Sequence, residues 1–145
     1  MGYQVKSYMK KEVITLDNDG TVTEAAKLMA ADKDYEGYVI ILKKGQPSGI
    51  VTERDIINKV LAKGLDPTKT KISEIMSTPL ITVDPDDDLL KASELMQKNN
   101  VRKLVVTRNS IIYGIITANV IAVRCGEYVD RSVRDIIRWT APLGF

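Results

Sequence analysis

The sequence predicts an α+β fold made of two copies of one strand–helix–strand–strand–helix unit. Residues 9–17 read Met-Lys-Lys-Glu-Val-Ile-Thr-Leu-Asp and residues 76–84 read Met-Ser-Thr-Pro-Leu-Ile-Thr-Val-Asp, so one pattern occurs twice, 67 residues apart. A fixed internal period indicates repeats whose apolar faces must be buried against each other. We therefore expect the copies, at 1–67 and 68–145, to pack against each other into one module with ligand sites at the seam.

In the first copy, short apolar runs alternate with helical patterns. Thr21 and Glu24 have the spacing of a capping box that opens a helix through Met29. Gly64 stands where a left-handed helix cap is expected. The last helix should place Ile56, Ile57, Val60 and Leu61 on one face. The expected order is strand 13–16, helix 22–29, strand 38–42, strand 48–51 and helix 53–63.

The second copy repeats this order. Its expected elements are strand 80–83, helix 89–97, strand 103–107, strand 111–116 and helix 118–127. The polar link 65–70 is too short for independent movement of the copies. Segments 5–9, 72–76 and 133–137 share a third apolar pattern, which predicts a short helical turn leading into each copy and a closing flank up to Phe145, with Trp139 in a core or interface.

The composition excludes several kinds of chemistry. The chain has no histidine and a single cysteine, Cys125, which excludes an internal disulfide, Cys/His metal clusters and Ser-His-Asp or Cys-His catalysis. The aspartate-rich segment 84–88 lacks the glycine and glutamate of a calcium loop, so we expect turn and helix-capping roles there. The sequence therefore predicts neither an enzyme nor a metal site.

Charge and hydropathy favour an ordinary globular protein. Apolar residues make up 44% of the 145 residues and charged residues 28%, with a net charge of +2 from interspersed charges. No apolar run approaches the roughly 20 residues of a membrane span, and the N-terminus lacks an apolar signal region. We expect a cytoplasmic protein with no membrane contact and no strong field for nucleic acid.

The segment 49–55, Gly-Ile-Val-Thr-Glu-Arg-Asp, runs from a strand into a helix N-terminus, where free backbone N–H groups favour an anion. Thr52 adds a hydroxyl donor, Arg54 adds charge for a phosphate, and Asp55 offers two acceptor oxygens suited to the vicinal hydroxyls of a ribose. The same Thr-x-x-Asp spacing caps a helix without any ligand. Spacing alone favours the cap, and both interpretations stay open.

These residues carry a resemblance to a known family. The shared opening pattern of the copies, the strand–turn–strand hairpin and the 49–55 segment resemble the cystathionine β-synthase (CBS) domain, and the tandem pair is similar to a Bateman module over essentially the whole chain. The resemblance implies a stand-alone regulatory module in which the two repeats pack with pseudo-two-fold symmetry. It also implies that the module binds adenine nucleotides, usually dimerises and regulates an associated protein.

The resemblance also implies which residues form two unequal clefts. In the second copy the position of Asp55 is held by Val120, which cannot accept hydrogen bonds from ribose, so the Asp55 cleft should be the principal one. The principal cleft would combine Ile50, Thr52, Arg54 and Asp55 with Thr82, Val101, Arg102 and Lys103. The weaker cleft would combine Thr15, Gly37, Tyr38 and Thr117.

The functional expectation is a sensor that binds AMP and acts, as a homodimer, through an unidentified regulated protein. ADP, ATP, S-adenosylmethionine and NAD stay open as ligands, because their adenosine half offers the same groups. The leading alternative is a dimerisation or interaction module that binds no ligand. Nucleic-acid binding is a further alternative, with an affinity that falls steeply with salt.

Overall fold

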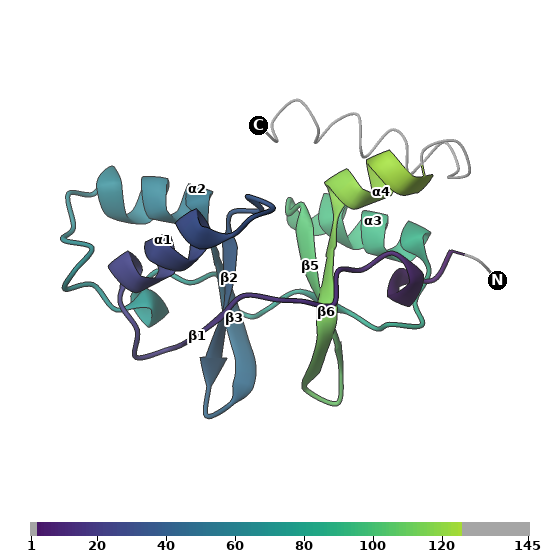
Figure 1. Cartoon of the computed structure of the whole chain (residues 1–145), viewed down its shortest axis with the longest axis horizontal. Helices are drawn as coiled ribbons and strands as arrows, with labels where there is room; N and C mark the ends of the chain where they lie inside the picture. The colour runs from purple at the N-terminus through teal and green to yellow at the C-terminus, as the bar shows by residue number, and fades with distance from the viewer. Residues whose placement is uncertain (1–2, 126–145) are drawn as a thin grey trace. The chain divides into compact units, whose positions relative to one another are not determined.

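The computed structural model describes residues 3–125. The chain divides into two compact units (Figure 1). One unit is Val13–Leu80, and the other joins the N-terminal residues up to Glu12 to the chain from Ile81 onward. No helix in the described part of the chain is long and apolar enough to cross a membrane.

The first unit is a three-stranded sheet with its helices packed against the hairpin. The central strand β2 pairs with β1 in parallel and with β3 in an antiparallel hairpin, with a bulge after Ile41. The elements are β1 (Thr15–Asp17), α1 (Val22–Ala31), β2 (Tyr38–Lys43), β3 (Gln46–Thr52), α2 (Glu53–Ile56), the π-helical turn η2 (Ile57–Leu61) and the 3₁₀ turn η3 (Ile72–Glu74).

The second unit repeats this topology. Strand β5 pairs with β4 in parallel and with β6 in an antiparallel hairpin, and the bulge recurs after Val106. The elements are the 3₁₀ turn η1 (Val5–Ser7), β4 (Thr82–Val83), α3 (Leu89–Asn99), β5 (Lys103–Arg108), β6 (Ile111–Thr117) and α4 (Ala118–Cys125). The predicted α+β fold with two strand–helix–strand–strand–helix repeats is confirmed.

Each unit has its own core, formed where one face of the first helix meets one face of the hairpin. Removal of these apolar side chains from water is the main stabilising contribution. In the first unit the core contains Val22, Ala25 and Met29 of α1, Val39 and Ile41 of β2, Val51 of β3 and Val60 of η2. In the second unit it contains Leu89, Ala92 and Met96 of α3, Leu104 and Val106 of β5, and Ile116 of β6.

The flank that precedes each repeat packs in the unit of the other repeat. Lys10 forms a backbone bridge with Ile115, and Ser77 forms the equivalent bridge with Ile50. Glycine is needed next to each bridge, because a Cβ on Gly114 would lie 2.4 Å from the Lys10 carbonyl oxygen. The compact unit that contains the first repeat therefore extends to Leu80, and the repeat boundary expected at 67/68 stays a prediction. The third copy of the flank pattern at 133–137, the closing flank and Trp139 lie outside the described residues.

The last helix of the first repeat differs from the prediction. It is α-helical only over α2 and continues as the π-helical turn η2, where the Ala62 N–H donates to the Ile57 carbonyl at 2.9 Å. Its four apolar residues do not form one buried face, because Ile57 is 54% and Leu61 64% exposed while Val60 is fully buried. The core covers only the narrower stripe of Ile56 and Val60. Gly64 has the left-handed φ expected of a cap, +69°.

Candidate functional site

Asp55 lies at the junction of β3 and α2 and is the most buried charged residue of its motif, at 8% exposed. One of its carboxylate oxygens, Oδ2, accepts from the Thr52 backbone N–H at 2.9 Å and from the Thr52 hydroxyl at 3.3 Å. This is the helix-capping arrangement that the Thr-x-x-Asp spacing predicts. The cap is therefore present in the structure, whatever else the carboxylate binds.

The second oxygen of Asp55 is also occupied. Its Oδ1 accepts from the Ser77 hydroxyl at 3.3 Å and pairs with the Lys59 ammonium at 3.0 Å. Lys59 donates in addition to the Ile75 carbonyl at 3.0 Å. A carboxylate has about four acceptor positions. Four donors of the chain itself thus meet the group that was predicted to bind a ribose.

Gly37 and Tyr38 adjoin this junction within the same unit. Tyr38 faces Thr52 in the β2–β3 register, and the Glu53 N–H donates to the Gly37 carbonyl at 3.1 Å. Gly37 has a φ of +65°, a left-handed conformation that favours glycine. Gly37 and Tyr38 are thus neighbours of the Thr52–Asp55 junction, whereas their predicted place in the cleft of Thr117 stays a prediction.

Thr15 and Ile50 complete the predicted residues of the first unit. Thr15 is exposed at the start of β1 and faces Ile40, and Ile50 is half-buried in β3. The predicted grouping of Thr15, Gly37 and Tyr38 with Thr117 joins residues of different units and stays a prediction.

In the second unit, Thr117 holds the place that Thr52 holds in the first. Its hydroxyl oxygen accepts from the Val120 N–H at 3.1 Å, which caps α4 without a carboxylate. Lys103 faces Thr117 in the β5–β6 register, and the Arg102 carbonyl accepts from the Ala118 N–H at 2.9 Å. The structure therefore brings Arg102 and Lys103 to Thr117.

Thr82 and Val101 also belong to the second unit. Thr82 is exposed in β4, and the half-buried Val101 donates its N–H to the Met96 carbonyl at the end of α3. Their predicted contribution, with Arg102 and Lys103, to the Asp55 cleft joins the two units and stays a prediction.

Two arginines of the predicted site carry charge that the described part of the chain does not neutralise. Arg54 is exposed next to Asp55, and Arg102 is half-buried beside β5. Within residues 3–125, neither guanidinium has an ion pair or a hydrogen bond. Arg54 is therefore available to an anion in the unit that also holds Asp55.

Basic side chains of the same unit pair with the carboxylates of the segment 84–88. Arg108 makes an ion pair with Asp84 and another with Asp86, both at 2.6 Å, and Lys6 reaches Asp86 at 2.9 Å. Hydrogen bonding from Arg108 lowers the pKa of Asp84 to about 2. Among residues 3–125 no cluster of His, Cys, Asp and Glu side chains is suited to hold a metal ion.

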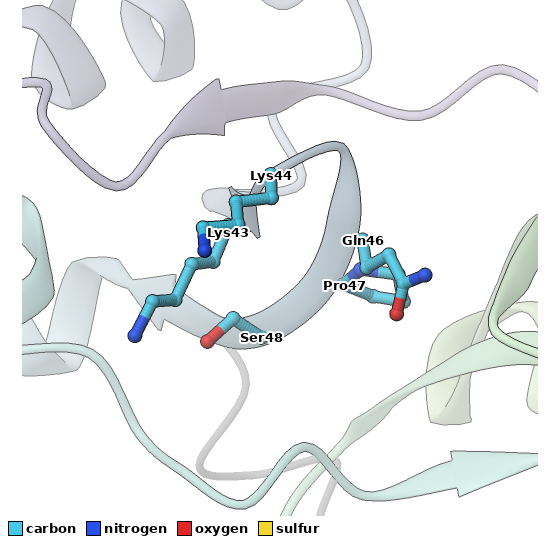
Figure 2. A pocket seen from close by; sticks show the side chains of 5 residues that line it. All are labelled: Lys43, Lys44, Gln46, Pro47 and Ser48. Carbon is cyan, nitrogen blue, oxygen red and sulfur yellow. The ribbon is translucent and has the colours of Figure 1, made fainter.

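One open pocket of about 450 Å³ lies at the turn of the β2–β3 hairpin (Figure 2). Its lining consists of Lys43, Lys44, Gln46, Pro47 and Ser48. None of the predicted site residues is among them, and the lysines are exposed surface side chains. The pocket is therefore not formed by the residues of the 49–55 segment.

Comparison with known proteins decides the family. Residues 5–62 and 72–122 each match the CBS domain model. The chain belongs to the CBS-domain family. Its two repeats form a CBS pair, a type of module that is generally regulatory and not catalytic. The CBS domain-containing protein YhcV of Bacillus subtilis (strain 168) is 34% identical over 119 residues, which cover 82% of this chain and 83% of that protein.

Solved structures share the fold of this CBS pair. A hexameric CBS-CP12 protein from bloom-forming cyanobacteria is 28% identical with a TM-score of 0.80, covering 98% of this chain and 89% of that one. The CBS domain protein PAE2072 from Pyrobaculum aerophilum, solved in complex with AMP, is 24% identical with a TM-score of 0.76, covering 94% and 98%. Three further curated relatives are matched over only 50%, 55% and 59% of their own length.

Proposed function

We propose that this CBS pair binds an adenine nucleotide, with AMP as the first choice, and regulates a partner protein according to ligand occupancy. The observation that carries the proposal is that one motif contains both a buried carboxylate and a guanidinium that has no ion pair within residues 3–125. Asp55 is 8% exposed at the start of α2, and Arg54 beside it is exposed without an ion pair in the described chain.

Each of these groups suits one part of a nucleotide. The Asp55 oxygens can accept hydrogen bonds from the two ribose hydroxyls, and a guanidinium binds phosphate oxygens through paired N–H groups. The AMP complex of the Pyrobaculum aerophilum protein supports this ligand class for the fold. Arg102 and Lys103 would add positive charge, as the resemblance to the family implies.

Regulation would follow from differential binding. A ligand favours the arrangement of the chain that binds it more tightly, and a partner that recognises this arrangement senses the ligand. A homodimer is part of the proposal, since Ile57, Leu61 and Leu65 expose apolar surface along η2 and the turn after it. The hexameric cyanobacterial protein supports assembly in proteins of this fold.

The experiment is a thermal-shift titration of the wild-type protein, Asp55→Ala and the control Asp19→Ala with AMP. Asp19 is an exposed carboxylate of the same unit, so the control removes the same charge. AMP should raise the melting temperature of the wild type and Asp19→Ala, because a ligand at about 100 times its Kd adds about 2.7 kcal/mol of stability. Asp55→Ala should show no AMP-dependent rise.

The alternative of an interaction module without a ligand has one observation in its favour. Four donors of the chain already meet Asp55, so the carboxylate is stabilised with no ligand at all. Absence of any shift in the melting temperature of the wild type at AMP concentrations well above millimolar would support this alternative. ADP, ATP, S-adenosylmethionine and NAD in the same titration would identify the preferred adenosyl ligand.

A further inference from the structure

The two oxygens of Asp55 are bonded by donors of different kinds. Both donors on Oδ2 belong to Thr52, one of them a backbone N–H held by the β3–α2 junction. Both donors on Oδ1 are side chains from elsewhere, the Ser77 hydroxyl at 3.3 Å and the Lys59 ammonium at 3.0 Å. A ligand can therefore replace the partners of Oδ1 without breaking a hydrogen bond to the main chain.

We propose that Lys59 and Ser77 set the affinity of the Asp55 site by competing with the ligand for Oδ1. This inference rests on the proposed function and adds two positioning residues that the 49–55 motif does not contain. Both donors can form hydrogen bonds with water after displacement, since Ser77 is exposed and the Lys59 side chain is 43% exposed. A ribose hydroxyl that binds Oδ1 must displace one of them, and the lost contact reduces the net gain from binding.

The same contacts connect the site to the flank of the second repeat. Lys59 lies in the middle of η2 and joins Asp55 to the Ile75 carbonyl. Ser77 is held against β3 by two backbone hydrogen bonds with Ile50, at 2.9 and 3.2 Å. Displacement of Lys59 or Ser77 from Asp55 would thus change the bonding of residues 75–77, which precede β4 in the chain. π-helical turns such as η2 occur frequently at functional sites.

Competition makes stability and affinity change in opposite directions. Lys59→Met removes the ammonium but keeps the chain length and the helix propensity of residue 59. The buried carboxylate then lacks one partner, so the protein should be less stable. A ribose hydroxyl now meets an underbonded oxygen, so AMP should bind more tightly. A purely structural role of Lys59 would lower both stability and affinity.

The test measures AMP affinity by isothermal titration calorimetry for the wild type and four variants. Lys59→Met should tighten the Kd about tenfold, the effect of 1.4 kcal/mol, which is near the value of one hydrogen bond to a charged group. Ser77→Ala should tighten it by a smaller factor, about threefold. Lys59→Arg keeps the charge and should bind as the wild type does. Lys63→Met, an exposed lysine one turn later, is the control for charge.

The outcomes separate the inference from the proposed function. Weaker or unchanged binding by Lys59→Met, with normal binding by the wild type, overturns the competition and leaves the nucleotide site intact. Tight binding by Lys59→Met when the wild type binds poorly supports both. No binding by any of the proteins overturns both. If Lys59→Met does not fold, an unchanged Kd in the exposed variant Ser77→Ala overturns the inference instead.

Discussion

At the scale of the residue, the two repeats differ at the position of the candidate ribose acceptor. Asp55 and Val120 follow equivalent threonines, and each helix start is capped, by the Asp55 carboxylate in one repeat and by the Thr117 hydroxyl in the other. A cap therefore does not need the carboxylate. The buried acid at residue 55 is therefore more than a cap requires, and its ligand role stays the proposal that the AMP titration tests.

Ser93 offers a test of burial energetics in the second unit. Its side chain lies in α3 at 1% exposed, and its hydroxyl has no hydrogen-bond partner in the described chain. Because an unsatisfied buried hydroxyl costs free energy and alanine is the better helix former, Ser93→Ala should raise the free energy of unfolding by about 1 kcal/mol. Urea denaturation measures this as a higher midpoint with an unchanged slope.

The control for Ser93 is Ser7→Ala, an exposed serine of the same unit. It should change the free energy of unfolding by less than about 0.5 kcal/mol. A destabilised Ser93→Ala protein would show that the hydroxyl has a partner, such as a bound water, that stabilises the fold.

Single residues were predictable from the sequence where local spacing decides their role. Thr52 and Asp55 could be found because a cap needs this spacing in any fold. Lys59 could not, since an Asp and a Lys four residues apart on a helix usually form an exposed pair of little energetic value. Its importance depends on the burial of Asp55 and on the Ile75 carbonyl, and both depend on how the 72–77 flank packs.

At the scale of the element, helix starts are fixed by local chemistry. The α1 helix begins with a complete capping box, in which the Glu24 N–H donates to the Thr21 hydroxyl at 3.2 Å and the Thr21 N–H donates to the Glu24 carboxylate at 3.2 Å. The predicted start agrees with the observed one for this reason. The π-helical turn η2 was not predictable, because its apolar residues also fit the period of an α-helix.

The capping box of α1 predicts different effects on stability for two chemically identical substitutions. Thr21→Ala removes the hydroxyl that accepts from Glu24, so it should lower the free energy of unfolding by about 1 kcal/mol. Thr23→Ala makes the same chemical change two residues later, where the described chain gives the hydroxyl no capping role, and should be nearly neutral. Chemical denaturation of both variants decides the point. Equal losses of stability would mean that packing of the methyl group, and not the cap, matters at Thr21.

At the scale of the whole molecule, the duplication made the fold predictable but did not indicate which repeat each flank packs against. The 67-residue period and the family resemblance were enough to predict two equivalent sheets with their helices. They assigned each flank to the repeat that follows it. The structure pairs each flank with the other repeat, through bridges beside Gly49 and Gly114 that depend on tertiary contact. The sequence could not predict these bridges, because the apolar pattern of a flank does not indicate which repeat it contacts.

A network of charges spans three separate segments of the second unit. Lys6 comes from the N-terminal flank, Asp84 and Asp86 from the loop before α3, and Arg108 from the end of β5. The pKa of Asp86 is lowered by hydrogen bonds first from Lys6 and then from Arg108. The pKa of Asp84 is lowered from 3.8 to about 2, chiefly by Arg108. The network thus connects the flank to the unit through groups that titrate in acid.

This network predicts how stability depends on pH. A lowered pKa in the folded state means that ionised Asp84 stabilises the fold above its unfolded value of about 3.9, and that this contribution disappears as the pH falls toward 2. Arg108→Gln removes the cause, so the wild type should be more stable than the variant above pH 4 and equal to it near pH 2. Thermal melts from pH 2 to 7 measure the difference.

The control for Arg108→Gln is Arg102→Gln, which removes an arginine without an ion pair in residues 3–125. Its stability difference from the wild type should not change with pH. The Arg108→Gln difference should also shrink in 1 M salt, because exposed charges are screened beyond about 3 Å at that ionic strength. If that difference stayed constant from pH 7 to pH 2, the packing of the long Arg108 side chain, and not its charge, would hold the flank to the unit.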